Sequence, residues 1–529
     1  MIVFIWVAVL IAVLVLYLRQ VYSSFSRNGI KHLKPIPLLG NMGPMLFRTK
    51  HFADDVANQY NSFPEERFVG MYQFVSESFL LRDVDLIKKV GVKDFEHFLD
   101  HRPIFSTTDT FFSRILFSLQ GQEWKDMRSS LSPAFTSSKM RLMVPFMVEV
   151  GNQMVNSVQK KIKESKSGYT DIECKDLTTR YTNDVIATCA FGLKVDSHND
   201  VDNKFYAMGN AASTFNFLQS LKSMFSGTLP KLAKALKIEI FSEEQKKFFR
   251  TIVLDTMANR EKKNIMRPDM IHLLMEAKKG KLTHEDNKST DEAAGFATVE
   301  ESAVGQKKVN RVWSDDDLVA QAVMFFIAGF ETVSAGLSFL LYELALNPDI
   351  QERLAQEIKE TDAKNGGLDF NSIQNMPYMD MVISELLRLW PPGFVLDRIC
   401  TKDYNVGKPN EKAEKDFIIR KGTPVFIPVI AIHRDPQYFS NPEKFDPERF
   451  SDENKHKIQS AAYMPFGVGP RNCIGSRFAF SEMKVMAYQI LLHLEVSPCE
   501  KTTIPATLDK KTFNLKLDGG FWLRFRARN

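Results

Sequence analysis

The chain has 529 residues, of which 44% are hydrophobic and 25% charged, and its formal net charge is +5 at pH 7. This balance excludes an intrinsically disordered chain, which would lack apolar residues or carry a large net charge. Basic and acidic residues are interspersed, so there is no basic footprint for nucleic acid, and we expect no nucleic-acid partner. Five separated cysteines without a Cys-x-x-Cys pair argue against a disulfide scaffold and favour a reducing compartment.

The chain opens with an uncharged apolar stretch from Ile2 to Leu18. As a helix that rises about 1.5 Å per residue, it just crosses a bilayer core of about 30 Å. The alternative is a cleaved signal peptide, but the stretch has no basic segment before it and no small-residue cleavage site after it. Only basic charges follow before Asp54, which places the rest of the chain in the cytosol. We expect a membrane anchor with a basic linker over residues 1–34 and one large domain over residues 35–529.

Most of the remaining chain shows apolar residues at three- and four-residue spacing, which is typical of amphipathic helices. The predicted helices cover residues 139–165, 175–190, 243–278, 314–346, 348–362 and 378–389. Strand patterns are fewer and shorter, at residues 69–82, 395–400, 416–429 and 513–525. Residues 280–312 are polar and nearly free of bulky apolar side chains, which predicts an exposed, mobile loop. The expected fold class is mainly α with a minor β portion.

A glycine-rich loop, FGVGPRNCIG, spans residues 466–475, and a helical pattern follows from Ser476. Glycines let a backbone pass close to a flat cofactor, and backbone N–H groups at a loop and helix start can stabilise a thiolate. Arg471 adds a fixed positive charge beside Cys473. A single buried cysteine is more often a small hydrophobic residue of the core, so the interpretation depends on the surrounding pattern.

That pattern, Phe-x-x-Gly-x-Arg-x-Cys-x-Gly, resembles the signature of the cytochrome P-450 superfamily at Phe466, Gly469, Arg471, Cys473 and Gly475. The resemblance implies the P-450 fold, a single haem domain behind the anchor, and haem b (iron protoporphyrin IX) as cofactor. It makes Cys473 the axial thiolate ligand of the iron, where it favours O–O cleavage. Phe466, Arg471 and Gly475 would contact the haem. The length, the anchor and the stretch Arg267-Pro268-Asp269-Met270 look like the microsomal class, especially insect members that metabolise foreign compounds.

Three arginine and tryptophan positions extend the resemblance. Trp124 and Arg128 lie four residues apart on one helix face and match the family's Trp-x-x-x-Arg, in which both side chains contact a haem propionate. By the same family logic, Arg398 pairs with the other propionate. The alternative for Trp124 and Arg128 is a core tryptophan beside an exposed arginine.

An acid and an alcohol, Glu331 and Thr332, stand within the apolar run from Leu318 to Leu346. Burying a carboxylate costs several kcal/mol unless it is hydrogen-bonded or hydrated. Gly329 thins this helix and Thr332 can turn its hydroxyl back onto a carbonyl, so the backbone could open locally to oxygen or water. The resemblance assigns the pair to proton delivery during dioxygen activation. The alternative is a solvated helix face.

Glu385 and Arg388 are three residues apart in a predicted helix and therefore share a face. The resemblance adds Arg449 and gives the three a structural role beneath the haem loop. His433-Arg434-Asp435 is not a kinase catalytic loop, because Pro436 follows and the chain has no phosphate-binding glycine loop.

The chain has 42 phenylalanines against 13 tyrosines and 5 tryptophans, which favours a lipophilic pocket and a lipophilic small-molecule substrate. Residues 215–236 mix apolar and basic side chains, which suits contact with a membrane surface. The candidates to line the pocket, about half of which we expect to be ordinary core, are Phe105, Phe111, Phe112, Phe117, Phe215, Phe217, Phe325, Phe326 and Phe394.

The expected function is a monooxygenase that inserts one oxygen atom of O2 into such a substrate, in xenobiotic or insecticide detoxification. The chain lacks a nucleotide or flavin motif of its own, so the resemblance implies an NADPH-dependent cytochrome reductase as electron donor, together with cytochrome b5. The expected location is the endoplasmic reticulum membrane, with the catalytic domain in the cytosol. Oxidation of an endogenous hormone, lipid or fatty acid is an alternative. A haem-thiolate isomerase or dehydratase is another, although such chemistry needs no Glu331-Thr332 pair. A non-catalytic haem carrier is the third.

Overall fold

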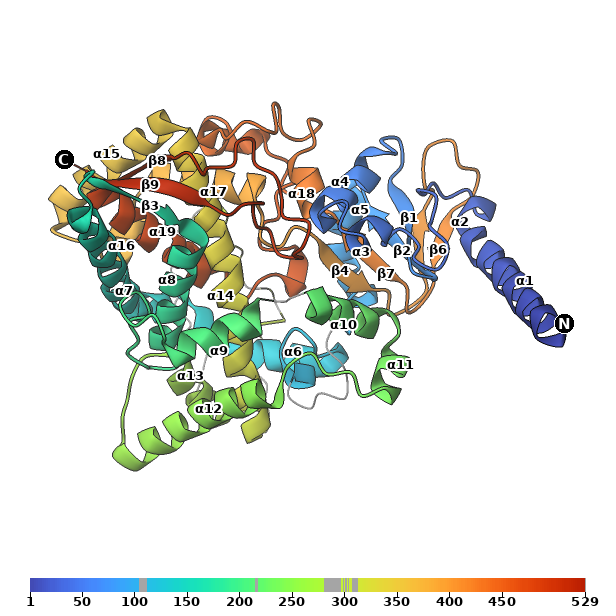
Figure 1. Cartoon of the computed structure of the whole chain (residues 1–529), viewed down its shortest axis with the longest axis horizontal. Helices are drawn as coiled ribbons and strands as arrows, with labels where there is room; N and C mark the ends of the chain where they lie inside the picture. Colours follow the sequence, from blue (N-terminus) through green and yellow to red (C-terminus); the bar gives the residue numbers. More distant parts are fainter. Residues whose placement is uncertain are drawn as a thin grey trace.

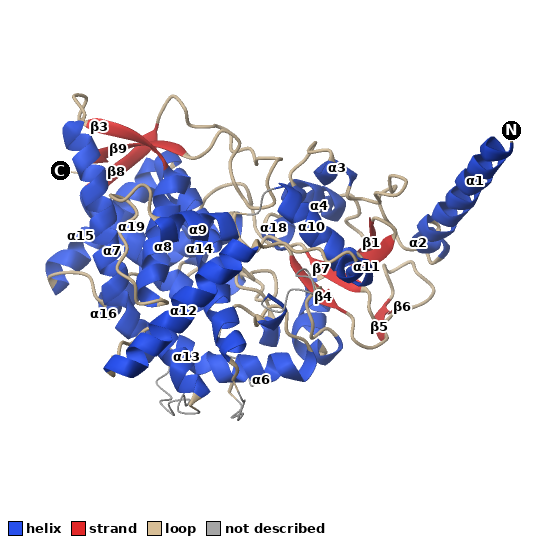
Figure 2. Ribbon diagram, turned by 60° about the horizontal axis from the view of Figure 1, so that its bottom comes forward, coloured by secondary structure: helices blue, strands red, loops and turns tan. Residues whose placement is uncertain are grey.

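A computed structural model describes residues 1–103, 112–214, 217–279, 296–297, 299, 302, 304–306 and 313–528. Nearly all of the loop predicted for residues 280–312 lies outside the described residues. In the described part, helices build most of the body and α1 projects from it, as Figure 1 and Figure 2 show from two directions. The α-helices are α1 (Ile2–Tyr22), α2 (Ser24–Arg27), α3 (Gly43–Leu46), α4 (Phe52–Asn61), α5 (Val84–Lys88), α6 (Gly121–Leu131), α7 (Ser137–Glu164), α8 (Cys174–Cys189), α9 (Lys204–Ser213), α10 (Phe217–Thr228), α11 (Pro230–Ala235), α12 (Glu243–Lys263), α13 (Met270–Lys278), α14 (Asp315–Leu346), α15 (Pro348–Asn365), α16 (Phe370–Gln374), α17 (Pro377–Leu389), α18 (Val429–His433) and α19 (Ser476–His493).

The described strands form three small sheets. The first has the order β1-β2-β7-β4, in which β1 and β2 form an antiparallel hairpin with Phe68 opposite Leu81, and β7 pairs parallel to β2 and antiparallel to β4. The second has the order β3-β9-β8 and is antiparallel, and β5 pairs with β6 in the third. The strands are β1 (Phe68–Gln73), β2 (Ser76–Leu81), β3 (Tyr169–Glu173), β4 (Leu396–Ile399), β5 (Tyr404–Gly407), β6 (Phe417–Ile419), β7 (Pro424–Ile427), β8 (Leu494–Pro498) and β9 (Trp522–Ala527).

The mainly helical fold class is confirmed, and five of the six predicted helices correspond to α7, α8, α14, α15 and α17. The single helix predicted for residues 243–278 is wrong, because the structure divides it into α12 and α13. Asn264 ends α12 in a left-handed conformation with φ of 51°, and Pro268 follows before α13 begins. Of the strand predicted for residues 513–525, only the end belongs to β9.

The helix α14 passes through the middle of the body (Figure 1) and packs closely against α8. It begins with a capping box, in which Ser314 and Asp317 satisfy each other's backbone N–H groups. On α8, the hydroxyls of Thr182 and Thr178 donate to the carbonyl oxygens of Phe330 and Ser334 on α14, at 3.2 and 3.0 Å. These two bonds fix the register of α14 in its middle, on both sides of Thr332.

The helix α1 has a mean hydropathy of 2.7 and is almost entirely exposed (Figure 2), which fits a membrane anchor. Among the described residues, α14 is the other helix long and apolar enough to cross a bilayer, but most of it is buried, as in the core helix of a globular domain. The last turns of α1 are held on the body. Tyr22 donates its hydroxyl to the carbonyl of Phe74 at 3.0 Å, and Leu18 is buried.

Candidate functional site

A cavity of about 400 Å³ lies inside the body between α6, α14 and the loop that precedes α19. Its walls are mostly apolar, with a few basic groups at one end. The structure brings nearly all of the sequence-predicted site residues to this cavity: Trp124, Arg128, Thr332, Arg398, Phe466, Arg471, Cys473 and Gly475. Glu331 does not line it.

The loop that carries Cys473 is held by its own backbone. The N–H of Cys473 donates to the carbonyl of Phe466 at 2.8 Å, and a 3-10 turn from Gly469 to Arg471 closes the loop before α19. The thiol surface is exposed, and it faces the cavity. Burial in the protein raises the pKa of Cys473, while the N–H of Gly475 and the charge of Arg128 lower it.

Gly469 is required by close packing beneath this loop. Its φ is +70°, and a Cβ at this position would lie 1.8 Å from the carbonyl oxygen of Gly91. The short π-helix Lys89–Lys93, which contains Gly91, thus supports the loop from behind. Any side chain at residue 469 would push the loop and the π-helix apart.

Two buried guanidinium groups face one end of the cavity. For Nη2 of Arg398, and for Nε and Nη1 of Arg471, the structure has no hydrogen-bond partner among the described residues. Burial lowers the pKa of Arg398, and burial together with repulsion from Arg398 lowers the pKa of Arg471 to about 9. Two unpaired cations this close are costly unless a bound anion compensates them.

His101 also lines this end of the cavity, and no sequence pattern singled it out. Its ring stacks on Phe117 with 4.2 Å between the ring centroids, and its Nδ1 lies 3.0 Å from a carboxylate oxygen of Asp397. Burial lowers the pKa of His101 to about 4, although the charge of Asp397 acts in the opposite direction. His101 is therefore neutral at pH 7 and can present its other ring nitrogen as a hydrogen-bonding group.

Trp124 and Arg128 both come from α6, as their spacing predicted. Arg128 donates to the backbone and side-chain oxygens of Asn472 at 2.7 and 2.9 Å, so it holds the residue next to Cys473. The guanidinium of Arg471 stacks over the Trp124 ring at 4.3 Å. The cysteine loop and α6 are thereby joined through charged side chains at the cavity wall.

On α14, the acid and the alcohol face different ways. The hydroxyl of Thr332 donates to the carbonyl of Ala328 at 2.6 Å, as the sequence suggested, and α14 continues as a helix through this position. The carboxylate of Glu331 instead pairs with Nζ of Lys175 on α8 at 3.1 Å, and Lys175 also donates to Ser334 at 2.6 Å. The ion pair with Lys175 thus holds the Glu331 side chain outside the cavity wall, next to Thr332, which lines it. The sequence did not indicate Lys175 as a partner.

Glu385, Arg388 and Arg449 form the expected cluster, which lies behind the cysteine loop. Arg388 donates from Nε and Nη2 to the two carboxylate oxygens of Glu385 at 2.7 and 2.9 Å, and both side chains are fully buried. Arg449 lies 3.3 Å from Glu385. Arg388 also donates to the carbonyl of His433 at 2.7 Å.

His433 connects this cluster to the cysteine loop. Its Nδ1 donates to the carbonyl of Arg388 at 3.1 Å, and its Nε2 accepts the N–H of Met464 at 3.0 Å, two residues before Phe466. Burial lowers the pKa of His433 to about 3, so the ring is neutral and serves once as donor and once as acceptor. The His-Arg-Asp stretch therefore has a structural place here.

Of the nine candidate phenylalanines, Phe117 and Phe325 line the cavity. Phe112, Phe326 and Phe394 are buried in the core away from it. Phe105, Phe111 and Phe215, and the side chain of Phe217, lie outside the described residues. Three phenylalanines that the sequence analysis did not assign to the pocket walls also line the cavity: Phe135, Phe466 and Phe478.

The cavity fits a haem. It offers a thiol at the centre of one wall, apolar sides for a flat macrocycle, and unpartnered guanidinium donors where two carboxylates would lie. Arg398 and Arg471 would hold the propionates, while Cys473 would face the iron. His101 donates its Nδ1–H to Asp397 and is left with an acceptor nitrogen, so it would not hold a carboxylate.

Removing one of these cations is expected to weaken haem retention. Arg398→Met should release haem to apomyoglobin on the order of tenfold faster, because one charge-assisted hydrogen bond worth roughly 1.5–3 kcal/mol is lost. The matched control is Arg420→Met, which removes an exposed arginine paired with Asp403 outside the cavity. Equal rates for Arg398→Met and the unmodified protein would show that this guanidinium does not hold the cofactor.

Comparison with known proteins agrees with the geometry. A family model described as cytochrome P450 matches residues 31–522. Cytochrome P450 9e2 of Blattella germanica is 44% identical over 98% of this chain and 97% of its own length. Cytochrome P450 9c1 of Drosophila melanogaster is 38% identical over 97% of each chain, and cytochrome P450 6k1 of Blattella germanica is 37% identical over 98% of this chain and 95% of its own. The chain belongs to the cytochrome P450 family, is a monooxygenase, and binds haem b through an axial cysteine thiolate.

Proposed function

We propose that Cys473 is the residue that ligates the haem iron, and that Trp124, Arg128, Arg398, Phe466, Arg471 and Gly475 hold the cofactor. One observation carries the proposal. Cys473 lines the same cavity as Arg398 and Arg471, whose guanidinium groups have nitrogens without a hydrogen-bond partner among the described residues. The other cysteines lie outside this arrangement or cannot serve. Cys189 lines the cavity from α8, but burial raises its pKa strongly, which disfavours a thiolate there.

When bound, haem supplies the activation of dioxygen. The residues of this chain hold and move the protons. Thr332 presents its hydroxyl at the cavity surface, and Glu331 with Lys175 lies directly behind it on α14 and α8. We assign Thr332 Oγ1 the delivery of a proton at the cavity surface, and Glu331 the replacement of that proton through water. The apolar walls exclude bulk water from the reaction.

Thr332→Ala is expected to uncouple electron use from product formation. NADPH oxidation in the reconstituted enzyme should continue, while product per NADPH falls on the order of tenfold or more and hydrogen peroxide rises, because a positioned proton donor is lost. Product, peroxide and NADPH are measured in one incubation. The matched control is Thr361→Ala on α15. The Thr361 hydroxyl also donates to the carbonyl four residues before it, that of Glu357, but it lies outside the cavity. Tight coupling in Thr332→Ala would contradict the assignment.

Residues 1–34 are proposed to be the membrane anchor and linker, and residues 35–529 the monooxygenase domain. The apolar run Ile2–Leu18 within α1 and the basic residues after it support insertion with the catalytic domain in the cytosol, at the endoplasmic reticulum. The electron donor would be the NADPH-dependent cytochrome reductase, with cytochrome b5 as a second donor. Labelling of the protein in intact microsomes with a cysteine-reactive, membrane-impermeant probe tests the orientation, because the membrane would protect a luminal domain from the probe.

The proposed substrates are lipophilic foreign compounds, including insecticides. The cavity walls support this class because they are largely apolar and include Phe117, Phe135 and Phe325. Microsomes that contain the enzyme, its reductase and NADPH are incubated with a panel of xenobiotics and of endogenous hormones and fatty acids, and products are identified by mass. Turnover confined to the endogenous compounds would overturn the proposed role in detoxification.

A further inference from the structure

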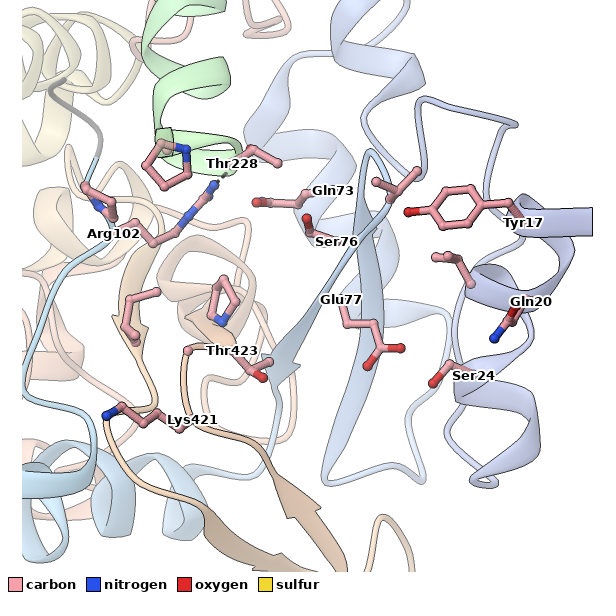
Figure 3. Close-up of a pocket in the computed structure, with 18 of the residues that line it drawn as sticks. Tyr17, Gln20, Ser24, Gln73, Ser76, Glu77, Arg102, Thr228, Lys421 and Thr423 are labelled. Atoms are coloured by element: carbon pink, nitrogen blue, oxygen red, sulfur yellow. Dashed lines mark hydrogen bonds between the residues drawn. The ribbon is translucent and has the colours of Figure 1, made fainter. Parts of the chain in front are cut away.

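A second cavity, of about 850 Å³, lies at the junction between α1 and the body. The end of α1 and the following α2 form one wall, and the turn between β1 and β2 forms the floor. The segment joining α10 to α11 and the turn between β6 and β7 form the opposite side (Figure 3). None of its lining residues belongs to the walls of the haem cavity. We call this cavity the anchor groove.

The anchor groove has a fixed place relative to α1. Besides the bond from Tyr22 to Phe74, the hydroxyl of Tyr72 donates to the carbonyl of Val21 at 3.1 Å, and the rings of Tyr22 and Tyr72 pack edge to face at 5.0 Å. Tyr17 and Gln20, which line the groove, belong to the last turns of α1 (Figure 3). In a helix that spans a bilayer, these turns lie at the level of the lipid headgroups.

The helices on the opposite side of the groove carry exposed apolar side chains that do not line it. Leu218 on α10 and Leu229, Leu232 and Leu236 around α11 are all exposed. Helices with exposed leucines and interspersed lysines lie in the interfacial region of a membrane. Lipid is therefore expected on both sides of the groove, and its open face lies toward the bilayer surface.

The charge of the groove favours an anion. Its lining contains Arg27, Arg102 and Lys421 but only one carboxylate, that of Glu77. Among the described residues, no ion pair is formed by any of these three cations. Arg102 donates from Nη2 to Thr228 at 3.2 Å, whereas its Nε is buried and has no described partner.

We propose that the anchor groove binds the headgroup of an anionic phospholipid from the leaflet in which α1 is inserted. The phosphate lies among Arg27, Arg102 and Lys421, with the hydroxyl of Ser76 as a further donor, and the acyl chains extend along the apolar surface of α1. The inference rests on the proposed insertion of α1 and adds a specific lipid site to it.

The test uses the full-length holoenzyme in phosphatidylcholine vesicles that contain a trace of photoactivatable phosphatidylserine or photoactivatable phosphatidylcholine. After irradiation, the labelled peptides are identified by mass. We expect the peptides that contain residues 17–27, 73–77 and 421–424 to be labelled several-fold more by the serine lipid. Arg27→Gln with Lys421→Gln should remove this several-fold excess and bring labelling by the serine lipid down to that by the choline lipid.

The matched control is Lys31→Gln with Lys34→Gln, which removes two basic residues on the same membrane flank outside the groove. An equal loss in this control would assign the effect to general surface charge and overturn the site. Displacement of the label by millimolar glycerol phosphate would assign the groove to a soluble phosphate and also overturn it. Flotation of the protein with the vesicles reports insertion of α1 separately, and the carbon monoxide difference spectrum reports the haem site, so failure of the proposed function is recognised independently.

Discussion

Replacing Cys473 by alanine is expected to abolish both the thiolate-type Soret band of the reduced carbon monoxide complex and all turnover. The reason is that the axial thiolate donates the electron density that favours O–O cleavage, and no other described cysteine combines cavity exposure with the loop and the cations around Cys473. The measurement is the carbon monoxide difference spectrum of purified protein, together with product formation on a lipophilic substrate.

The control for this variant is Cys499→Ala, which removes a partly exposed cysteine outside the cavity. Its spectrum and turnover should match those of the unmodified protein. A thiolate-type band that survives in Cys473→Ala would mean that another residue ligates the iron, and the assignment of the loop would then be wrong.

Arg388→Ala is expected to destabilise the fold by about 3–5 kcal/mol, because it leaves the fully buried carboxylate of Glu385 without its bidentate partner. Burial already raises the pKa of Glu385 against the effect of Arg388, so loss of that partner favours a protonated, poorly bonded acid. Since Arg388 also accounts for one of the bonds to His433, the cysteine loop should lose its support. The expected result is little haem-loaded protein and a strongly lowered thermal midpoint for loss of the thiolate spectrum.

Arg353→Ala is the matched control for the cluster. Arg353 is an exposed arginine that pairs with Glu448 and stacks on Tyr378, and exposed pairs contribute about 0–1 kcal/mol. If both variants lowered the thermal midpoint to the same small extent, Glu385 and Arg388 would not be the structural cluster that the geometry indicates.

The residues that meet at the cavity could be predicted from the sequence because their motifs have fixed spacing within single elements. Cys473, Arg471 and Phe466 share one loop, and Trp124 and Arg128 share one helix face, so local sequence determines their arrangement. The long helices were predictable for the same reason, since their periodicity is local.

The residues that were missed acquire their place through contacts between distant segments. His101 reaches Asp397 across 296 residues, and Lys175 reaches Glu331 from another helix. Nothing near either residue in the sequence indicates a partner. The same holds for β3, which is short and becomes a strand by pairing with β9 near the other end of the chain.

The phenylalanines could not be sorted between cavity and core from the sequence, for a related reason. Phe325 and Phe326 are adjacent on α14, but only Phe325 lines the cavity, while Phe326 packs against Phe205 and Phe249. Composition predicts that a lipophilic pocket exists, whereas helix rotation, set by the bonds from Thr178 and Thr182, decides which ring enters it.

The tautomer of His433 has a consequence for acid tolerance. The imidazole must stay uncharged to bridge Arg388 and Met464, and burial lowers its pKa in the folded protein to about 3, so the bridge persists in the folded protein well below pH 6.5. The unfolded chain, in contrast, takes up a proton at this residue below about pH 6.5. The contribution of His433 to the free energy of folding is therefore complete above about pH 6.5 and declines as the pH falls toward 3. Mild acid should first shorten the lifetime of the folded haem protein. In the molecules that remain folded, the surroundings of the Cys473 sulfur should be unchanged.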